Sequence, residues 1–171
     1  LHSERLADIA LTAPEPSDQR TTSLEKGPPP VIEVRNLRFR YGQNEPWVLD
    51  GVSFHIEPGE TLAIVGPSGC GKTTLLKLLA SLILPTEGEI LVDGRTLTQV
   101  GTERYRALLG VVMQDDQLFA GSLADNISFF SESPDPGRIA ECARLASVAD
   151  EILATPMAYD TLIGDMGTVL S

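Results

Sequence analysis

An eight-residue loop at positions 66–73, with the sequence GPSGCGKT, constrains this chain more than any other feature. It satisfies the pattern GxxxxGK(S/T), which is typical of phosphate-binding loops that lie between a strand and a helix. Residues 60–65 (ETLAIV) form a nearly continuous apolar run of the kind found in buried parallel strands. Residues 73–84 (TTLLKLLASLIL) have an apolar helical pattern that ends before Pro85. The order of strand, loop and helix predicts a phosphate-binding site. The alternative is a glycine-rich turn that binds nothing.

Glycines in this loop allow successive backbone N–H groups to point at one anion, and the helix that starts near Lys72 directs its positive dipole end there. We expect Lys72 to bridge β- and γ-phosphate oxygens, Thr73 to offer its hydroxyl to Mg²⁺, and Thr74 to reach the α-phosphate. Cys70 is either a small loop filler or a thiol that bound nucleotide protects from alkylation. The residues expected to contact the nucleotide here are Gly66, Ser68, Gly69, Cys70, Gly71, Lys72, Thr73 and Thr74.

Composition excludes some classes of partner. A length of 171 residues suits one domain with a buried core. The formal net charge of −11 has the wrong sign for a surface that neutralises nucleic-acid phosphates, so we expect no nucleic-acid partner. The longest apolar stretch, 75–84, is interrupted by Lys77 and Ser81 and is shorter than the roughly 20 residues of a membrane helix. Cys70 and Cys142 have no zinc-site or disulfide spacing, which favours a reducing cytosolic setting.

Three segments of the chain differ in pattern. Residues 1–11 have near-helical apolar spacing, residues 12–30 have the Pro-, Ser- and Thr-rich composition of a flexible linker, and residues 31–171 have the pattern of a folded domain. The elements expected in this domain, besides the strand, loop and helix above, are antiparallel strands in VIEVRNLRFRY and VSFHI, a strand in GEILVDG (88–94), a second buried strand in LLGVVMQ (108–114), two short helices within 135–154, and a loop in TLIGDMGTVLS (161–171).

The motifs around the loop decide between families that share it. The GTPase motifs NKxD and DxxG do not occur. Residues 31–94, from VIEVRNLRFRYGQNEPW to GEILVDG, resemble the N-terminal part of an ABC transporter nucleotide-binding domain. The resemblance implies that Tyr41 stacks on the adenine base of ATP and that Val48 touches the adenine or ribose, because an aromatic ring suits a flat base. The alternative is a core role for Tyr41, with Trp47 as the stacking residue.

The downstream run VVMQDDQLFAGSLADNISF resembles the Q-loop region of the same family, in its exporter form. The resemblance implies that the amide of Gln114, at the end of a buried strand, binds Mg²⁺ or the attacking water and couples the site to the transmembrane part. Phe119, Phe129 and Phe130 are expected either to dock a coupling helix or to pack in a core. The resemblance covers residues 31–171, and residues 1–11 (LHSERLADIAL) resemble the cytoplasmic end of the last transmembrane helix that precedes such a domain. The runs QDDQLFAGSLADNISFF and PMAYDTLIGDMGTVLS, together with the start LHSERL, are most similar to bacterial peptide exporters of the colicin V, or bacteriocin, type. Those exporters carry an N-terminal cysteine peptidase that removes double-glycine leaders.

The last two residues, Leu170 and Ser171, resemble the start of the LSGGQ signature, so we expect a chain truncated at this motif. No Walker B motif or switch histidine occurs in the 171 residues, and no general base with a motif remains, so we expect no ATPase activity from them alone. The implied fold is α/β, a truncated P-loop NTPase core with an antiparallel β subdomain and a partial helical subdomain.

The resemblance implies an ATP-binding part of an ABC exporter at the cytoplasmic face of the bacterial inner membrane. Its implied partners are the transmembrane domain of the same exporter, a second nucleotide-binding domain in a homodimer, and a bacteriocin-like peptide cargo handled by the membrane domain. The alternatives are a lipid or drug exporter and, from another class, a soluble ABC ATPase or nucleotide-binding module without transport. Membrane recovery of the parent protein separates these classes.

Overall fold

The computed structural model describes residues 28–114 and 116–164. The chain divides into two compact units, Leu1–Val111 and Val112–Ser171, and each is described here by itself. The helix end expected at 1–11, most of the linker at 12–30, and the residues Leu170 and Ser171 lie outside the described residues.

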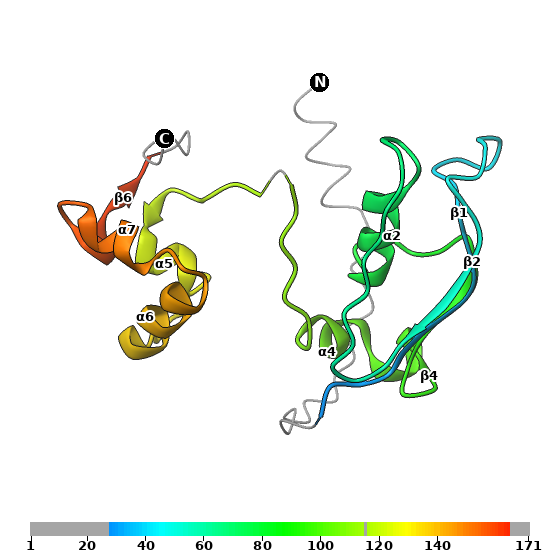
Figure 1. Cartoon of the computed structure of the whole chain (residues 1–171), viewed down its shortest axis with the longest axis horizontal. Helices are drawn as coiled ribbons and strands as arrows, with labels where there is room; N and C mark the ends of the chain where they lie inside the picture. The colour runs from blue at the N-terminus through cyan, green and yellow to red at the C-terminus, as the bar shows by residue number, and fades with distance from the viewer. Residues whose placement is uncertain (1–27, 115, 165–171) are drawn as a thin grey trace, which may run out of the picture. The chain divides into compact units, whose positions relative to one another are not determined.

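An antiparallel sheet forms the frame of the first unit (Figure 1). Its strands follow the spatial order β2-β1-β3-β4, and β1 pairs antiparallel with both of its neighbours. The antiparallel strands expected before the loop are therefore confirmed, as is the strand expected at 88–94. The strand bounds are β1 (Ile32–Phe39), β2 (Leu49–Ile56), β3 (Glu87–Val92) and β4 (Arg95–Thr96).

The sheet and helix α2 (Lys72–Leu79) bury a common apolar core. Leu37 of the sheet and Leu78 of the helix are both 0% exposed, and Leu75 packs in the same cluster. Full burial of each such side chain contributes about 1.5–3 kcal/mol. Because Leu75 and Leu78 lie three residues apart, they share one helix face, and this contact places the start of α2 beside the sheet.

Helix α2 ends at Leu79, earlier than the stretch to residue 84 that the apolar pattern predicts. Ser81 takes a left-handed conformation with φ of 56°, and the Leu82 N–H donates to the Lys77 carbonyl at 2.8 Å. This arrangement is a Schellman motif, which reverses the chain and satisfies the final carbonyls. Apolar residues continue past the end of the helix, so the pattern alone overestimates its length.

Side chains from the short helix α4 (Thr102–Arg106) complete this helix end. The buried Tyr105 hydroxyl donates to the Leu79 carbonyl at 2.6 Å, and Arg106 donates to the Ser81 carbonyl. Helix α3 (Leu97–Val100) precedes α4 and is capped by a Thr96–Gln99 capping box. The last carbonyls of a helix have no partners within the helix. At the C-terminal end of α2, these carbonyls are bonded by the groups just described.

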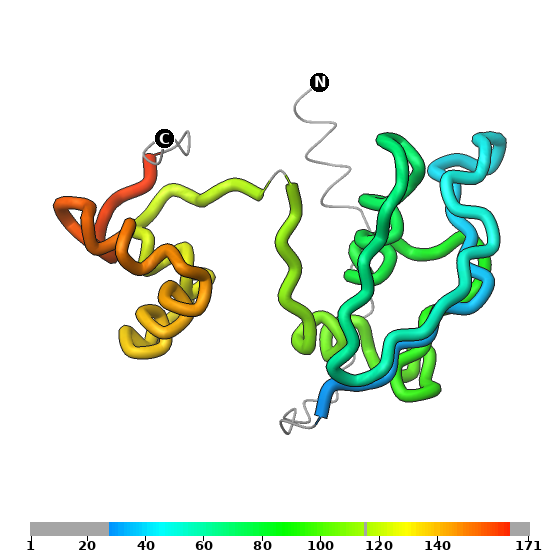
Figure 2. The backbone as a smooth tube through the Cα atoms, viewed as in Figure 1, coloured from blue at the N-terminus to red at the C-terminus, as the bar shows by residue number. Residues whose placement is uncertain are grey.

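Two segments expected as buried parallel strands do not form strands. Residues 60–65 and 108–114 have no ladder partners among the described residues. Figure 1 draws neither segment as an arrow, and Figure 2 follows the path of their backbone. The side chains of Val65 and Val112 are 88% and 91% exposed. The physical reason is that a strand exists only when a neighbour takes its hydrogen bonds, and the part of the chain that the structure describes offers none to these segments.

Within its described residues, the second unit packs three α-helices around a small core of Leu123, Ala143, Ile152 and Ile163. The two helices expected within 135–154 are confirmed as α6 and α7. The prediction of a loop at 161–171 is wrong at Leu162–Ile163, because these two residues form strand β6, which pairs antiparallel with β5. The bounds are β5 (Gly121–Ser122), α5 (Leu123–Ile127), α6 (Pro136–Leu145), α7 (Ala149–Ala154), the 3-10 helix η1 (Ala158–Asp160) and β6 (Leu162–Ile163).

Within residues 28–114 and 116–164, every helix is too short, or not apolar enough, to cross a membrane.

Candidate functional site

The side chain of Lys72 folds back over the loop that precedes it. Its Nζ donates to the Gly66 carbonyl at 2.9 Å and to the Pro67 carbonyl at 2.7 Å, and lies 3.7 Å from the Cys70 Sγ. The loop itself turns at Pro67–Cys70, where the Cys70 N–H approaches the Pro67 carbonyl at 3.4 Å. The ammonium group therefore lies where the loop curves around it, with donors directed at the loop.

The start of α2 is suited to an anion. Gly71 is the N-cap and supplies no side-chain hydrogen bond, and no acidic residue stands in the first turn. The first N–H groups of a helix have no intrahelical acceptors, and the helix dipole makes this end positive. A phosphate group would meet unneutralised donors here, together with the charge of Lys72.

Gly71 brings the sheet and the loop into close contact. Its φ is +93°, and a Cβ atom added here would lie 3.0 Å from the Val48 carbonyl oxygen and 2.9 Å from Leu49 Cδ2. A glycine is required for this approach, because a side chain has neither the conformation nor the space. Val48, which is half-buried, therefore lies next to the helix start. The structure brings together Val48 and Gly71, which the sequence predicted as nucleotide contacts from separate motifs.

Tyr41 also reaches the start of α2. Its hydroxyl and the Thr74 Oγ1 are 3.2 Å apart, and its ring lies 4.9 Å from the Phe39 ring at an interplanar angle of 87°. Tyr41 is 62% exposed, whereas Thr74 and Phe39 are each 7% exposed. The Tyr41 ring is therefore a surface ring attached to the core, which excludes the core alternative and leaves ring surface for a ligand.

Trp47, the alternative stacking residue, is already covered by cations. The Arg40 guanidinium lies 4.5 Å and that of Arg38 lies 5.7 Å from its ring centroid. Trp47 is half-buried, and a base would have to displace a cation–π contact to stack on it. The geometry therefore favours Tyr41. The contact of Arg40 with Trp47 had no local sequence signal, because it depends on the fold of the β1–β2 hairpin.

The remaining loop residues stand at the surface. Ser68, Gly69 and Cys70 are exposed in the turn, and both Cys70 and Cys142 are free cysteines. Thr73 is exposed at the first turn of α2, where its hydroxyl oxygen suits Mg²⁺, which prefers oxygen ligands and retains several waters. The position of Thr73 therefore fits the ion expected with ATP.

Gln114 belongs to the second unit, whereas the loop at 66–73 belongs to the first. It is exposed in a turn and does not end a buried strand, which corrects the sequence-based expectation. The aromatic residues that follow are exposed too. Phe119 is 69%, Phe129 89% and Phe130 48% exposed, and the Phe119 and Phe130 rings are perpendicular at 6.2 Å. These exposed fractions exclude a buried core for the three rings within the described second unit.

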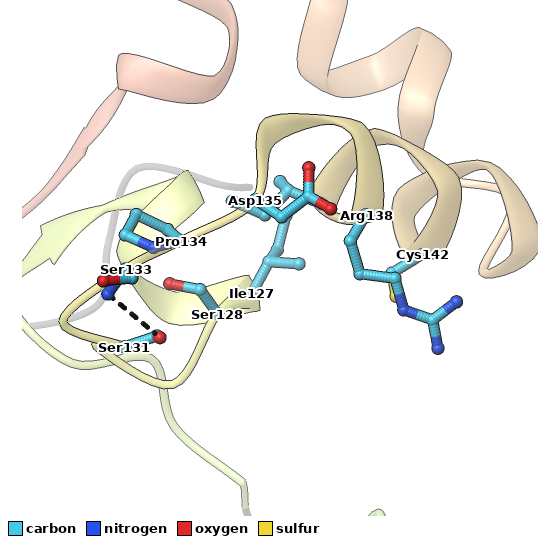
Figure 3. A pocket seen from close by; sticks show the side chains of 9 residues that line it. Ile127, Ser128, Ser131, Ser133, Pro134, Asp135, Arg138 and Cys142 are labelled. Carbon is cyan, nitrogen blue, oxygen red and sulfur yellow. Dashed lines mark hydrogen bonds between the residues drawn. The ribbon is translucent and has the colours of Figure 1, made fainter.

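A pocket of about 190 Å³ lies in the second unit, between the end of α5 and the start of α6 (Figure 3). Several of its polar groups are bonded within the chain. Asp135 caps α6 by accepting from the Gly137 N–H at 2.9 Å, Arg138 pairs with Glu141 at 2.8 Å, and the Ser128 hydroxyl donates to the Asp125 carbonyl. The loop at 66–73 is therefore the stronger candidate site.

The chain is similar in sequence to ABC transporter proteins. The family model described as ABC transporter matches residues 49–171. The chain is 42% identical to the probable microcin-H47 secretion/processing ATP-binding protein MchF and 40% identical to the colicin V secretion/processing ATP-binding protein CvaB, both of Escherichia coli. Each match covers all of this chain and 24% of the relative. It is also 40% identical to the ATP-dependent lipid A-core flippase of Alkalilimnicola ehrlichii, over 98% of this chain and 28% of the flippase.

A solved structure supports the same assignment. The structure of a bacterial Atm1-family ABC exporter with ATP bound has a TM-score of 0.83 and 33% identity, and the match covers 99% of this chain and 30% of that chain. The expected α/β fold class is thereby confirmed, as is the resemblance to bacteriocin-type relatives. The chain spans about a quarter of the length of the curated relatives it matches. It belongs to the ABC transporter family.

Proposed function

We propose that the chain is the ATP-binding part of an ABC exporter that couples ATP binding and hydrolysis to the export of a bacteriocin-like peptide across the bacterial inner membrane. One observation carries the nucleotide-binding part of this proposal. The uncapped start of α2, with Lys72 over the loop, lies in contact with Val48 and Tyr41, so a phosphate site and a surface for a base adjoin each other.

Each residue of this site has a role that follows from its place. Lys72 and the N–H groups at the start of α2 bind the β- and γ-phosphates, and the exposed loop residues Gly66, Ser68, Gly69 and Cys70 surround them. Thr74 lies toward the α-phosphate, while Val48 and Tyr41 hold the ribose and adenine. These groups orient ATP through charge and shape, which is most of what phosphoryl transfer requires of a protein.

Mg²⁺, held by Thr73, would neutralise phosphate charge when bound. We assign to the Gln114 amide the role of binding this ion or the attacking water. These 171 residues include no acidic residue with the sequence context of a general base. We therefore expect these residues alone to bind ATP without hydrolysing it.

The peptide cargo rests on the names of the colicin V and microcin-H47 secretion/processing relatives, each matched over the whole chain. The lipid A-core flippase, at 40% identity, supports a lipid exporter as the second candidate. The complete exporter reconstituted in vesicles distinguishes the two. A peptide with a double-glycine leader should stimulate its ATPase activity, whereas stimulation by lipid A alone would favour the second candidate.

The same proposal includes the assembly. The partners are the transmembrane domain of the exporter, on the cytoplasmic face of the membrane, and a second nucleotide-binding domain in a homodimer. Recovery of the parent protein in the membrane fraction tests this placement. Recovery in the soluble fraction would favour the soluble ATPase class.

A titration with a fluorescent ATP analogue and Mg²⁺ tests the binding site, with phosphate release measured in the same samples. The variant Lys72→Ala should lose saturable binding, because it removes a cation that lies over the loop. Lys77→Ala is the matched control, because it removes the same charge from the last turn of the same helix. Equal binding by both variants would contradict the site, and turnover by the wild-type chain would contradict the expected inactivity.

A further inference from the structure

We propose that the hydroxyl groups of Tyr41 and Thr74 form a latch that holds the Tyr41 ring in position for the base, so that Thr74 is a positioning residue for base recognition. This inference rests on the proposed function and adds a residue pair to it. It concerns the hydroxyl of Tyr41, whereas stacking on adenine concerns only the ring.

The Tyr41 ring needs something to hold it. Tyr41 lies beyond the end of β1, in the hairpin loop that the hydrogen bond from the Val48 N–H to the Phe39 carbonyl closes at 2.9 Å. A side chain that is 62% exposed in a loop has little packing to restrict its rotamers. The perpendicular contact with Phe39 restrains one part of the ring, and the hydroxyl restrains its far end.

Thr74 is a firm anchor for that hydroxyl. It is 7% exposed in the first turn of α2, one residue before Leu75, which packs in the core. The two hydroxyl oxygens are 3.2 Å apart and either can donate, so the pair satisfies a polar group that would otherwise be buried without a partner. The ring is thereby attached directly to the helix that holds Lys72.

This attachment has a consequence for binding. A ring held in place before the ligand arrives loses less conformational entropy on binding than a mobile ring does. The base surface and the phosphate loop also move as one body, because the first turn of α2 belongs to both. Affinity for a nucleotide should therefore depend on the Tyr41 hydroxyl, whereas affinity for a phosphate chain without a base should not.

The variant Tyr41→Phe isolates the latch, because it keeps the ring and removes only the hydroxyl. We expect its affinity for Mg·ATP to fall about two- to tenfold, the loss of one hydrogen bond, with no change for tripolyphosphate. Thr74→Val should lower the ratio of the two affinities by the same factor, and Thr74→Ser should restore the ratio. In the double variant, the ratio of Mg·ATP affinity to tripolyphosphate affinity should fall no further than in either single variant, because both substitutions remove the same hydrogen bond.

Tyr159→Phe is the control, because it removes a tyrosine hydroxyl from the second unit. Tripolyphosphate binding also reports that each variant still forms its loop. An unchanged ATP affinity in Tyr41→Phe, an equal loss of both affinities, or additive effects in the double variant would each overturn the latch. If the wild-type chain binds neither ligand, the proposed function fails and the latch fails with it. If the wild-type chain binds both ligands and Tyr41→Phe matches it, only the latch fails.

Discussion

Gly88 shows how one residue can be required by its neighbours across a sheet. It lies in β3 opposite an irregular part of β1, where Asn36 has a φ of 46° and the strand register shifts. Its own φ is +82°, and an added Cβ would lie 2.3 Å from the Asn36 carbonyl oxygen and 2.6 Å from that of Arg35. Backbone atoms cannot move aside as a flexible side chain can, so no substitution fits here without displacing β1.

Gly88→Ala should therefore lower the free energy of unfolding by about 2–4 kcal/mol, through backbone strain and the clash with β1. Gly94→Ala is the matched control, because Gly94 has a similar φ of +74° but nothing lies within 4 Å of its added Cβ. It should cost only about 1 kcal/mol, the price of the left-handed conformation. Urea denaturation measures both, and equal losses would show that the contact with β1 is unimportant.

Tyr105 carries a pH dependence that the structure explains. Its burial raises the pKa of the phenol above its usual value, because a charged phenolate is unfavourable away from water. The folded-state pKa then exceeds the unfolded-state pKa of about 10. Its contribution to stability is fully present below pH 10 and is lost as pH rises through the folded-state pKa.

Tyr105→Phe should remove this alkaline loss of stability. At neutral pH it should cost about 1 kcal/mol, because the Leu79 carbonyl loses its hydrogen bond. Thermal unfolding at pH 7 and at pH 10.5, followed by circular dichroism, checks both expectations. A variant with the same alkaline decline as the wild type would assign the decline to other groups.

At the scale of the element, helix α5 depends on a charged capping box. The Ser122 Oγ accepts from the Asp125 N–H at 3.0 Å, and the Asp125 Oδ2 accepts from the Ser122 N–H at 2.9 Å and the Ser122 hydroxyl at 2.7 Å. These bonds from Ser122 lower the pKa of the Asp125 carboxyl. Helix α3 has a neutral counterpart in Thr96 and Gln99, which offers an internal comparison.

Ser122→Ala should cost about 1 kcal/mol of stability, which is typical of a lost N-cap. The Asp125 carboxylate contributes fully to stability above about pH 4, the usual pKa of an aspartate. This contribution is lost as pH falls through the lowered pKa of Asp125 in the folded state. The backbone amides of α5 should therefore lose protection against hydrogen exchange in acid, after correction for intrinsic rates. The amides of α3 should keep their protection, because the α3 capping box has no ionisable group. Equal acid sensitivity of the two helices would contradict this assignment.

The same scale shows why some elements were predictable and others were not. Helix α6 begins with Asp135 as N-cap and Pro136 at its first position, and both are local signals of a helix start. Strand β6 has two residues, too few to form a pattern, and exists because it pairs with β5. Residues 60–65 have the composition of a strand, but composition cannot supply a neighbouring strand.

At the scale of the whole molecule, exposed apolar side chains should dominate the behaviour of the isolated chain. Val65 and Val112 lie 88% and 91% exposed on segments without strand partners among the described residues, and Phe129 is 89% exposed. Unpaired backbone and apolar surface together favour association between chains. We expect the purified 171-residue chain to be poorly stable or to aggregate.

Val112→Lys should raise the soluble fraction, measured by sedimentation after a fixed incubation, because it puts a charge where the exposed apolar segment invites pairing. Thr98→Lys is the control, since it makes the same change in net charge at an exposed polar position in α3. An equal rise of the soluble fraction in both variants would mean that the added net charge, and not the position of Val112, causes the change. A wild-type chain that stays fully soluble through the same incubation would contradict the expected aggregation.

The sequence by itself determined the position of the GxxxxGK(S/T) loop, the antiparallel strands before it, the start of the helix after it and the family. These features are carried by local patterns, in which each residue interacts with others a few positions away. Only the tertiary structure decided that Tyr41 meets Thr74, that Val48 meets Gly71, and that residues 60–65 have no strand partner among the described residues. The physical reason is that such contacts join residues distant in the chain, and their energies depend on the packing of whole elements.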